Sequence, residues 1–171
     1  MRTLLIIDML NDFCTKDGAL YVGPQVKPVI ENIRKEIESI KKKSGSVIYL
    51  CDEHTPNDEE FKLFPPHCIA GSHGECVINE LEPTEHDQVF KKNTFSGVRA
   101  NGQINDFLMD DDELIVCGVC TSICVMETVS DLSKYMSLKI KVLKNCCCDL
   151  SKESHEMALN RMATLFGAEI I

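Results

Sequence analysis

The stretch Leu114-Ile115-Val116-Cys117-Gly118-Val119-Cys120-Thr121-Ser122-Ile123-Cys124-Val125 decides the fold of this chain. Its first four residues form an apolar run that predicts a buried strand, and a helix-like pattern follows at 126–135. A turn between a strand and a helix lies at the helix N-terminus, where free N–H groups and the helix dipole favour an anion. A cysteine at that place has its thiolate stabilised, and a thiolate attacks carbonyl carbon. Cys124 is therefore a candidate nucleophile.

Strand-like and helix-like segments alternate along the whole chain. Apolar runs predict strands at 3–7, 47–51, 88–90, 114–117, 140–143 and 169–171. Apolar residues spaced by three and four predict helices over 26–40 and 158–166, and a helical turn near 77–81. Such alternation implies a parallel sheet covered on both faces. We expect one α/β domain over 1–171, a three-layer α/β/α structure with a mostly parallel six-stranded sheet.

Composition argues against several function classes. The net charge is −9, and acidic and basic residues are spread along the chain. This charge argues against a nucleic-acid partner. No apolar run approaches the roughly 20 residues that span a membrane, and no segment resembles a signal peptide. We therefore expect a cytoplasmic protein without a membrane partner. We then expect its ten cysteines to be reduced thiols. Cys117 and Cys120 have the spacing of half a zinc site, but Cys117 lies in an apolar strand run, and the consecutive cysteines 146–148 cannot all converge on one metal, so small buried side chains are favoured over a zinc site.

Chemically active side chains follow the predicted strands. Ligands bind beyond the carboxyl ends of parallel strands, so Asp8, Asp52, Lys92 and the turn 120–124 should meet at one edge of the sheet. A thiol that attacks an amide needs a base that later returns the proton to the leaving amine. Asp8 could do both, and the Lys92 ammonium would keep the carboxylate ionised and favour the thiolate. Taken alone, each of these residues could also be an ordinary turn or surface residue.

A second group of residues has the chemistry of metal ligands. Asp52, His54 and His67 offer carboxylate and imidazole, which suit zinc, iron or manganese. Further carboxylates in the same loop could complete the set: Asp58, Glu59 and Glu60. Clusters of polar residues in loops are also commonly just solvated. Spacing alone therefore leaves two interpretations open, a metal site and a solvated loop.

Two aromatic residues are candidates for the wall of a pocket. Phe13 follows the first strand and Phe64 precedes two prolines, both in expected loops near the catalytic edge. Flat rings there could stack on an aromatic ligand, or they could simply anchor their loops.

Taken in order, these motifs resemble the cysteine-hydrolase superfamily that contains isochorismatases and nicotinamidases. The resemblance covers essentially the whole chain, through residues 5–13 (LIIDMLNDF), 52–56 (DEHTP), 64–68 (FPPHC), 90–97 (FKKNTFSG) and 118–125 (GVCTSICV). The 52–56 and 64–68 pieces resemble the metal-binding nicotinamidase branch in particular. The chain departs from the branch at Asp58, where a histidine is usual, at Phe64, where tryptophan is frequent, and at Val98, where an aromatic residue is usual.

The resemblance implies roles for individual residues. Asp8 would be the base, Lys92 the cation and Cys124 the nucleophile, with a cis peptide between Val119 and Cys120. The backbone N–H groups of Cys120 and Cys124 would form an oxyanion hole. The resemblance also implies one divalent metal, zinc first, with iron or manganese as alternatives. Its ligands would be Asp52, His54 and His67, with Asp58 as a candidate fourth ligand. Phe13 and Phe64 would lie beside an aromatic ring of the substrate.

The expected activity is therefore the hydrolysis of nicotinamide to nicotinate and ammonia through a thioester on Cys124. The expected partner is a small-molecule amide substrate, and we expect a homo-oligomer. One alternative is a metal-free hydrolase of another small amide, carbamoyl or vinyl-ether compound. The other is a catalytically silent thiol-redox or binding protein, for which ten cysteines offer material.

Overall fold

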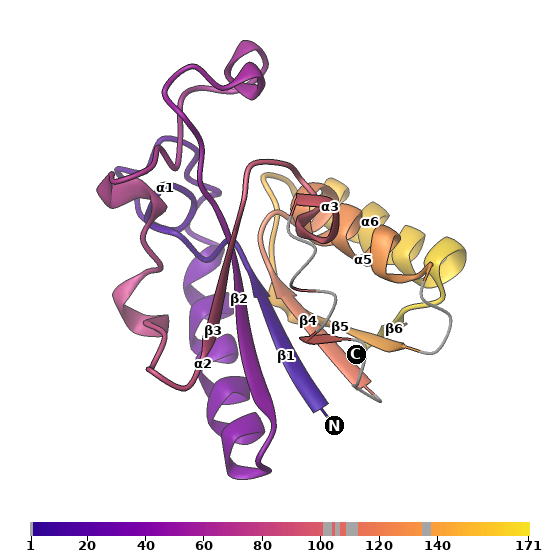
Figure 1. Cartoon of the computed structure of the whole chain (residues 1–171). Helices are drawn as coiled ribbons and strands as arrows, with labels where there is room; N and C mark the ends of the chain where they lie inside the picture. Colours follow the sequence, from indigo (N-terminus) through magenta and orange to yellow (C-terminus); the bar gives the residue numbers. More distant parts are fainter. Residues whose placement is uncertain (1, 101–103, 105–106, 109–112, 135–137) are drawn as a thin grey trace.

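A six-stranded parallel sheet forms the centre of the protein, here a computed structural model that describes residues 2–100, 104, 107–108, 113–134 and 138–171 (Figure 1). In spatial order the strands are β3 (Gln88–Lys92), β2 (Ser46–Asp52), β1 (Arg2–Ile7), β4 (Glu113–Gly118), β5 (Lys139–Cys147) and β6 (Glu169–Ile170). Every neighbouring pair is parallel. The predicted α/β fold is confirmed, and the sheet is parallel throughout.

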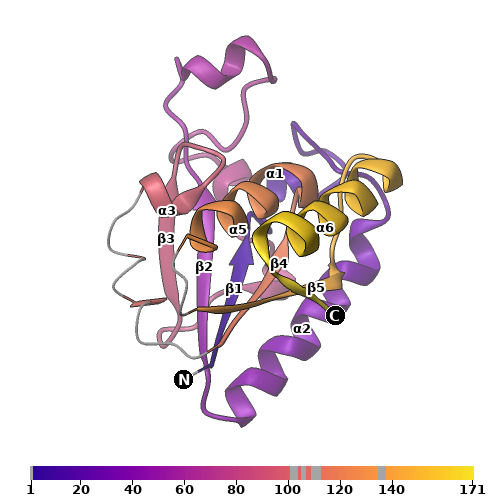
Figure 2. The same cartoon turned by 90° about the vertical axis from the view of Figure 1, so that its right-hand side faces the viewer.

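Helices cover both faces of the sheet. Helix α2 (Val26–Lys42) lies on one face, and α5 (Met126–Leu132) and α6 (Lys152–Phe166) lie on the other (Figures 1 and 2). Two short helices, α1 (Asn11–Cys14) and α3 (Gly97–Ala100), follow β1 and β3. Within the described part of the chain, no helix combines the length and the apolar character needed to cross a membrane.

Helices α2 and α6 form over the predicted segments, although α6 already begins at Lys152, before the predicted start at 158. The buried side chains of α2 recur at helical spacing: Val26, Val29, Ile33 and Ile40. Helix α6 begins after Ser151, whose hydroxyl accepts a hydrogen bond from the N–H of Ser154, and it ends at Gly167 in the left-handed conformation.

The long segment between β2 and β3 has a defined path across the carboxyl edge of the sheet. It contains three short 3-10 helices: η1 (Glu59–Lys62), η2 (His73–Glu75) and η3 (Asn79–Leu81). The last of them matches the predicted turn near 77–81. Isolated bridges join Leu10 to Val77 and His54 to Ile69, so the segment is tied both to the end of β1 and to itself.

The central strands end at the same level, which brings their last residues together. Ile7 pairs with Leu50 on one side and with Gly118 on the other. Strand β3 continues two residues beyond the predicted end because Lys92 pairs with Asp52 in the ladder. Gly118 has φ of +123°, and a Cβ there would overlap with the carbonyl oxygen of Ile7. Only glycine therefore lets β4 end so close to β1.

Candidate active site

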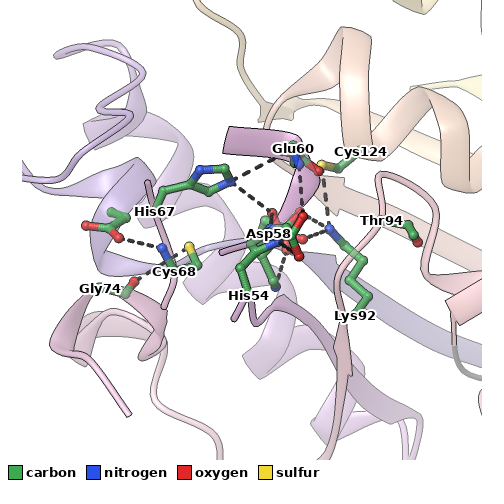
Figure 3. Close-up of polar contacts among 12 residues, drawn as sticks. His54, Asp58, Glu60, His67, Cys68, Gly74, Lys92, Thr94 and Cys124 are labelled. Atoms are coloured by element: carbon green, nitrogen blue, oxygen red, sulfur yellow. Dashed lines mark hydrogen bonds and ion pairs between the residues drawn. The ribbon is translucent and has the colours of Figure 1, made fainter. Parts of the chain in front are cut away.

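Asp8, Lys92 and Cys124 meet at the carboxyl edge of the sheet (Figure 3). The Lys92 ammonium lies 2.8 Å from Oδ2 of Asp8 and 3.6 Å from Sγ of Cys124. It also pairs with Oδ1 of Asp52. All of these side chains are buried. The structure thus joins, in one cluster, three groups that lie far apart in the sequence.

Asp8 is held firmly at the end of β1. Its N–H donates to the carbonyl of Leu50, and its Oδ1 accepts from the N–H of Asp52, both at 2.9 Å. Burial and the neighbouring Asp52 carboxylate raise the pKa of Asp8 to about 7, against the opposing effect of Lys92. A carboxyl group with such a pKa can both take and return a proton near neutrality.

Cys124 lies in a π-helical turn, η4 (Thr121–Val125), that leads directly into α5. Burial raises the pKa of the Cys124 thiol well above its ordinary range, and the Lys92 cation opposes this only in part. Burial therefore opposes the thiolate that the helix start is expected to favour. A carboxylate oxygen of Asp8 lies within 4.8 Å of the sulfur.

Lys92 remains a cation although it is buried. Burial opposes its charge, but Asp8, Cys124 and Asp52 together raise the pKa of Lys92 well above its ordinary value. A permanent positive charge beside the sulfur lowers the free energy of a thiolate when it forms.

The turn that carries Cys124 is fixed through its backbone. The peptide bond between Val119 and Cys120 is cis. The N–H of Thr121 donates to the carbonyl of Cys148 at 3.0 Å, and the N–H of Ser122 donates to the Asp149 carboxylate at 2.5 Å. Sequence reasoning missed Asp149, although the strand-end rule that selected Asp8 also applies to a carboxylate just after β5.

The metal-binding residues expected from the sequence also converge. Asp52 Oδ2 lies 3.8 Å from Nε2 of His54 and 3.9 Å from Nε2 of His67. Two ligands each about 2.1 Å from a tetrahedral zinc ion are about 3.4 Å apart, so these donors are close to the spacing of a metal site. Nε2 of His54 is buried and has no hydrogen-bond partner within the described residues, as expected of an atom placed for a metal.

The second ring nitrogens of the two histidines face oxygen atoms. Nδ1 of His67 lies 2.8 Å from the carbonyl of Pro65, so this nitrogen carries the proton and Nε2 keeps its lone pair. Nδ1 of His54 lies 3.1 Å from Oδ2 of Asp58, an ion-pair distance without the geometry of a hydrogen bond. Burial disfavours the imidazolium, yet the carboxylates of Asp52 and Asp58 outweigh it and raise the pKa of His54 to about 9. The environment of His54 therefore favours a positive charge, which a divalent cation would supply.

The prediction of Asp58 as a fourth ligand needs correction. Asp58 caps the N-terminus of η1, where its Oδ1 accepts from the N–H of Glu60, and its other oxygen faces the far side of the His54 ring. Glu60 faces the cluster instead, with Oε1 at 3.7 Å from Nε2 of His67. Of the three loop acids, Glu60 fits a fourth ligand best, and Glu59 forms an exposed pair with Lys62.

An apolar pocket connects the two groups of residues. The polar groups that line it are Asp52, Glu60 and His67, and the thiols are those of Cys120 and Cys124. Its apolar lining contains Phe13 and Phe64, as expected, together with Leu20, Phe95, Ile123 and Leu150, which the sequence reasoning did not select. The rings of Phe64 and Phe95 meet edge to face at 6.2 Å. The pocket therefore combines flat apolar walls with carboxylate, imidazole and thiol groups.

The remaining cysteines do not form another site. All ten are free thiols, and every one except Cys76 is buried. Among the described residues, Cys124 is the only cysteine in a group with metal-ligating geometry. The interpretation of the others as small buried side chains agrees with this placement.

Comparison with known proteins points in one direction. The family model of the isochorismatase domain matches residues 2–171. The chain is 29% identical over 185 residues to an uncharacterized isochorismatase family protein of Bacillus subtilis, which covers 99% of this chain and 98% of that protein. It is 28% identical over 183 residues to the nicotinamidase/pyrazinamidase of Mycobacterium tuberculosis, covering 96% and 95%. The crystal structure of a pyrazinamidase/nicotinamidase from Streptococcus mutans superposes with a TM-score of 0.91 at 27% identity and covers 100% of both chains.

Proposed function

The chain belongs to the isochorismatase domain family, and we propose that it is a metal-dependent cysteine amidohydrolase of the nicotinamidase type. The observation that carries this proposal is that Cys124, from the first cluster, and Asp52 and His67, from the second, line one apolar pocket, with Asp52 paired to Lys92. The names of the relatives in Mycobacterium tuberculosis and Streptococcus mutans support the same substrate class.

The proposed reaction begins with the transfer of the Cys124 proton to the ionised Asp8 carboxylate. The thiolate, stabilised by Lys92 at 3.6 Å, adds to the carboxamide carbon. Collapse of the tetrahedral intermediate breaks the C–N bond, and ammonia leaves with the proton that Asp8 held. Water then hydrolyses the thioester with Asp8 as the base, which releases the acid and regenerates the thiol.

The turn at 120–124 is proposed to hold the oxyanion. The backbone N–H groups of Cys120 and Cys124 would donate to the substrate oxygen, while the neighbouring N–H groups of Thr121 and Ser122 are anchored to Cys148 and Asp149. Removing one donor of such a hole typically costs about 2.7–4 kcal/mol in activation free energy. The anchored groups keep the turn in place while the charge develops.

Asp52, His54 and His67 would hold the metal, with Glu60 as the fourth protein group beside them. When bound, the ion would supply a Lewis acid for a ring nitrogen of the substrate or for a water molecule. Phe13 and Phe64 would confine an aromatic ring between this end of the pocket and the thiol. An aromatic ring with a nitrogen at one side and a carboxamide at the other, such as nicotinamide, matches this arrangement.

Ammonia release from nicotinamide, measured with and without a chelator, tests the proposal. We expect turnover that a chelator abolishes and that added zinc, iron or manganese restores. The Cys124→Ala variant should lose turnover but still bind nicotinamide in calorimetry, since the pocket walls remain. Turnover by Cys124→Ala would reject the nucleophile, and full activity in chelator would reject the metal.

The alternative functions predict different results in the same assay. A metal-free relative with another substrate would release product from another amide, a carbamoyl compound or a vinyl ether, but not from nicotinamide. A thiol-redox or binding protein would release no ammonia from any amide. Cytoplasmic location and a homo-oligomer stay predictions, which cell fractionation and sizing by light scattering would check.

A further inference from the structure

Asp12 lies outside the two clusters, yet its side chain contacts the loop that carries His67. It belongs to α1, four residues after Asp8, and is half-buried. Its Oδ2 accepts a hydrogen bond from the N–H of Cys68 at 2.7 Å, and its Oδ1 accepts from the N–H of Ala19 at 3.2 Å. The carboxylate therefore joins two loops to α1 by charge-assisted hydrogen bonds.

The backbone of Cys68 links the two histidines of the metal cluster. Cys68 directly follows His67, and its carbonyl accepts from the N–H of His54 at 2.9 Å. In Figure 3, Cys68 and Gly74 lie next to His67 on the side away from Lys92. A hydrogen bond at the Cys68 N–H thus holds the residue that directly follows His67 and whose carbonyl binds the backbone of His54.

Cys68 also has a backbone conformation that needs support. Its φ is +45°, a region that residues with a Cβ seldom adopt. The Asp12 carboxylate accepts a hydrogen bond from the N–H of Cys68, and this bond can stabilise the backbone conformation of Cys68.

Gly74 leaves the space that the Asp12 carboxylate occupies. A Cβ on Gly74 would overlap with Oδ2 and Cγ of Asp12. Because Gly74 has no side chain, the Asp12 carboxylate fits beside it. A methyl group at position 74 would displace the Asp12 carboxylate.

We propose that Asp12 is a positioning residue for the metal site, and that it acts on His67 and His54 through the backbone of Cys68. This role rests on the metal site of the proposed function. Asp12 touches neither the expected metal nor the substrate, so its effect should appear in metal affinity before it appears in chemistry. Loss of such a supporting group typically weakens metal binding about 10–100-fold.

The test is the zinc affinity of the metal-free protein, measured by competition with a chromophoric chelator, together with the melting temperature without metal. Asp12→Ala should bind zinc about 10–100-fold more weakly. Gly74→Ala should show a similar loss although Asp12 is intact, because the methyl group displaces the carboxylate. Asp12→Asn keeps one acceptor oxygen for Cys68 and should stay within about threefold of the wild type. Glu82→Ala, which removes an exposed acid from the same long loop, should change nothing.

Two results would overturn the role of Asp12. If Asp12→Ala and Gly74→Ala melt at a lower temperature but bind zinc as the wild type does, Asp12 is merely structural. If the wild-type protein itself binds no zinc, the metal site of the proposed function fails, and this role fails with it. Should Asp12→Ala not fold, Gly74→Ala and Asp12→Asn still decide between the outcomes.

Discussion

Replacing Lys92 by methionine should reveal how strongly the active-site cluster depends on its buried cation. Methionine keeps much of the apolar stem of lysine but has no charge. The Lys92 side chain is 0% exposed and faces the carboxylates of Asp8 and Asp52, which are 1% and 5% exposed. Removing one partner of a buried ion pair typically costs about 3–5 kcal/mol. Because two carboxylates lose the same partner here, we expect the free energy of unfolding of Lys92→Met to fall by about 4–5 kcal/mol.

Urea unfolding in the presence of a chelator measures this loss without a contribution from bound metal. With a denaturant slope of about 2 kcal/mol per M, the midpoint should fall by about 2 M. Lys91→Met is the matched control, since the neighbouring lysine is 38% exposed and pairs with Glu53 and Glu75. Exposed pairs of this kind contribute about 0–1 kcal/mol. Adding Asp8→Asn to Lys92→Met should restore part of the stability, because one uncompensated charge is removed. Equal losses in Lys92→Met and Lys91→Met would refute the reasoning.

Two further predictions concern the strand end and the metal. Gly118→Ala should destabilise the protein by more than about 3 kcal/mol in urea unfolding, since its φ of +123° and the Ile7 carbonyl both exclude a side chain; a loss below about 1 kcal/mol would contradict this close approach. Asp52→Ala combined with His54→Ala should remove the stoichiometric metal in elemental analysis, while His86→Ala, an exposed histidine on the same segment, should leave it unchanged. Metal retained by the double variant would reject the site.

The sheet edge could be predicted from the sequence because it follows from local patterns. Apolar runs mark the strands, and in a parallel sheet the residue after each run reaches the same edge. Asp8, Lys92 and Cys124 are found there. The exact end of β3 was less predictable, since Lys92 belongs to the strand through its pairing with Asp52. That pairing is a long-range interaction with no local signal.

The chemistry of the loop was harder to predict because it depends on the three-dimensional path. The sequence left Asp58, Glu59 and Glu60 open as a further ligand, with Asp58 the candidate from the family resemblance; in the structure Asp58 caps η1, and Glu60 faces His67. The surroundings of the Cys124 thiol were hard to predict for a similar reason. A helix start favours a thiolate, whereas burial under the surrounding loops disfavours it more, and burial is visible only in the folded chain.

Asp52 links the proposed catalytic and metal sites through its two carboxylate oxygens. Oδ1 pairs with Lys92, whereas Oδ2 faces the Nε2 atoms of His54 and His67. A substitution of Asp52 therefore removes a proposed metal ligand and also an ion partner of Lys92. His54 does not pair with Lys92. His54→Ala should therefore weaken metal binding, but in the metal-free protein it should lower the free energy of unfolding less than Asp52→Ala does. If both variants lose the same stability without metal, the Lys92–Asp52 pair contributes little, and Asp8 alone balances the buried cation.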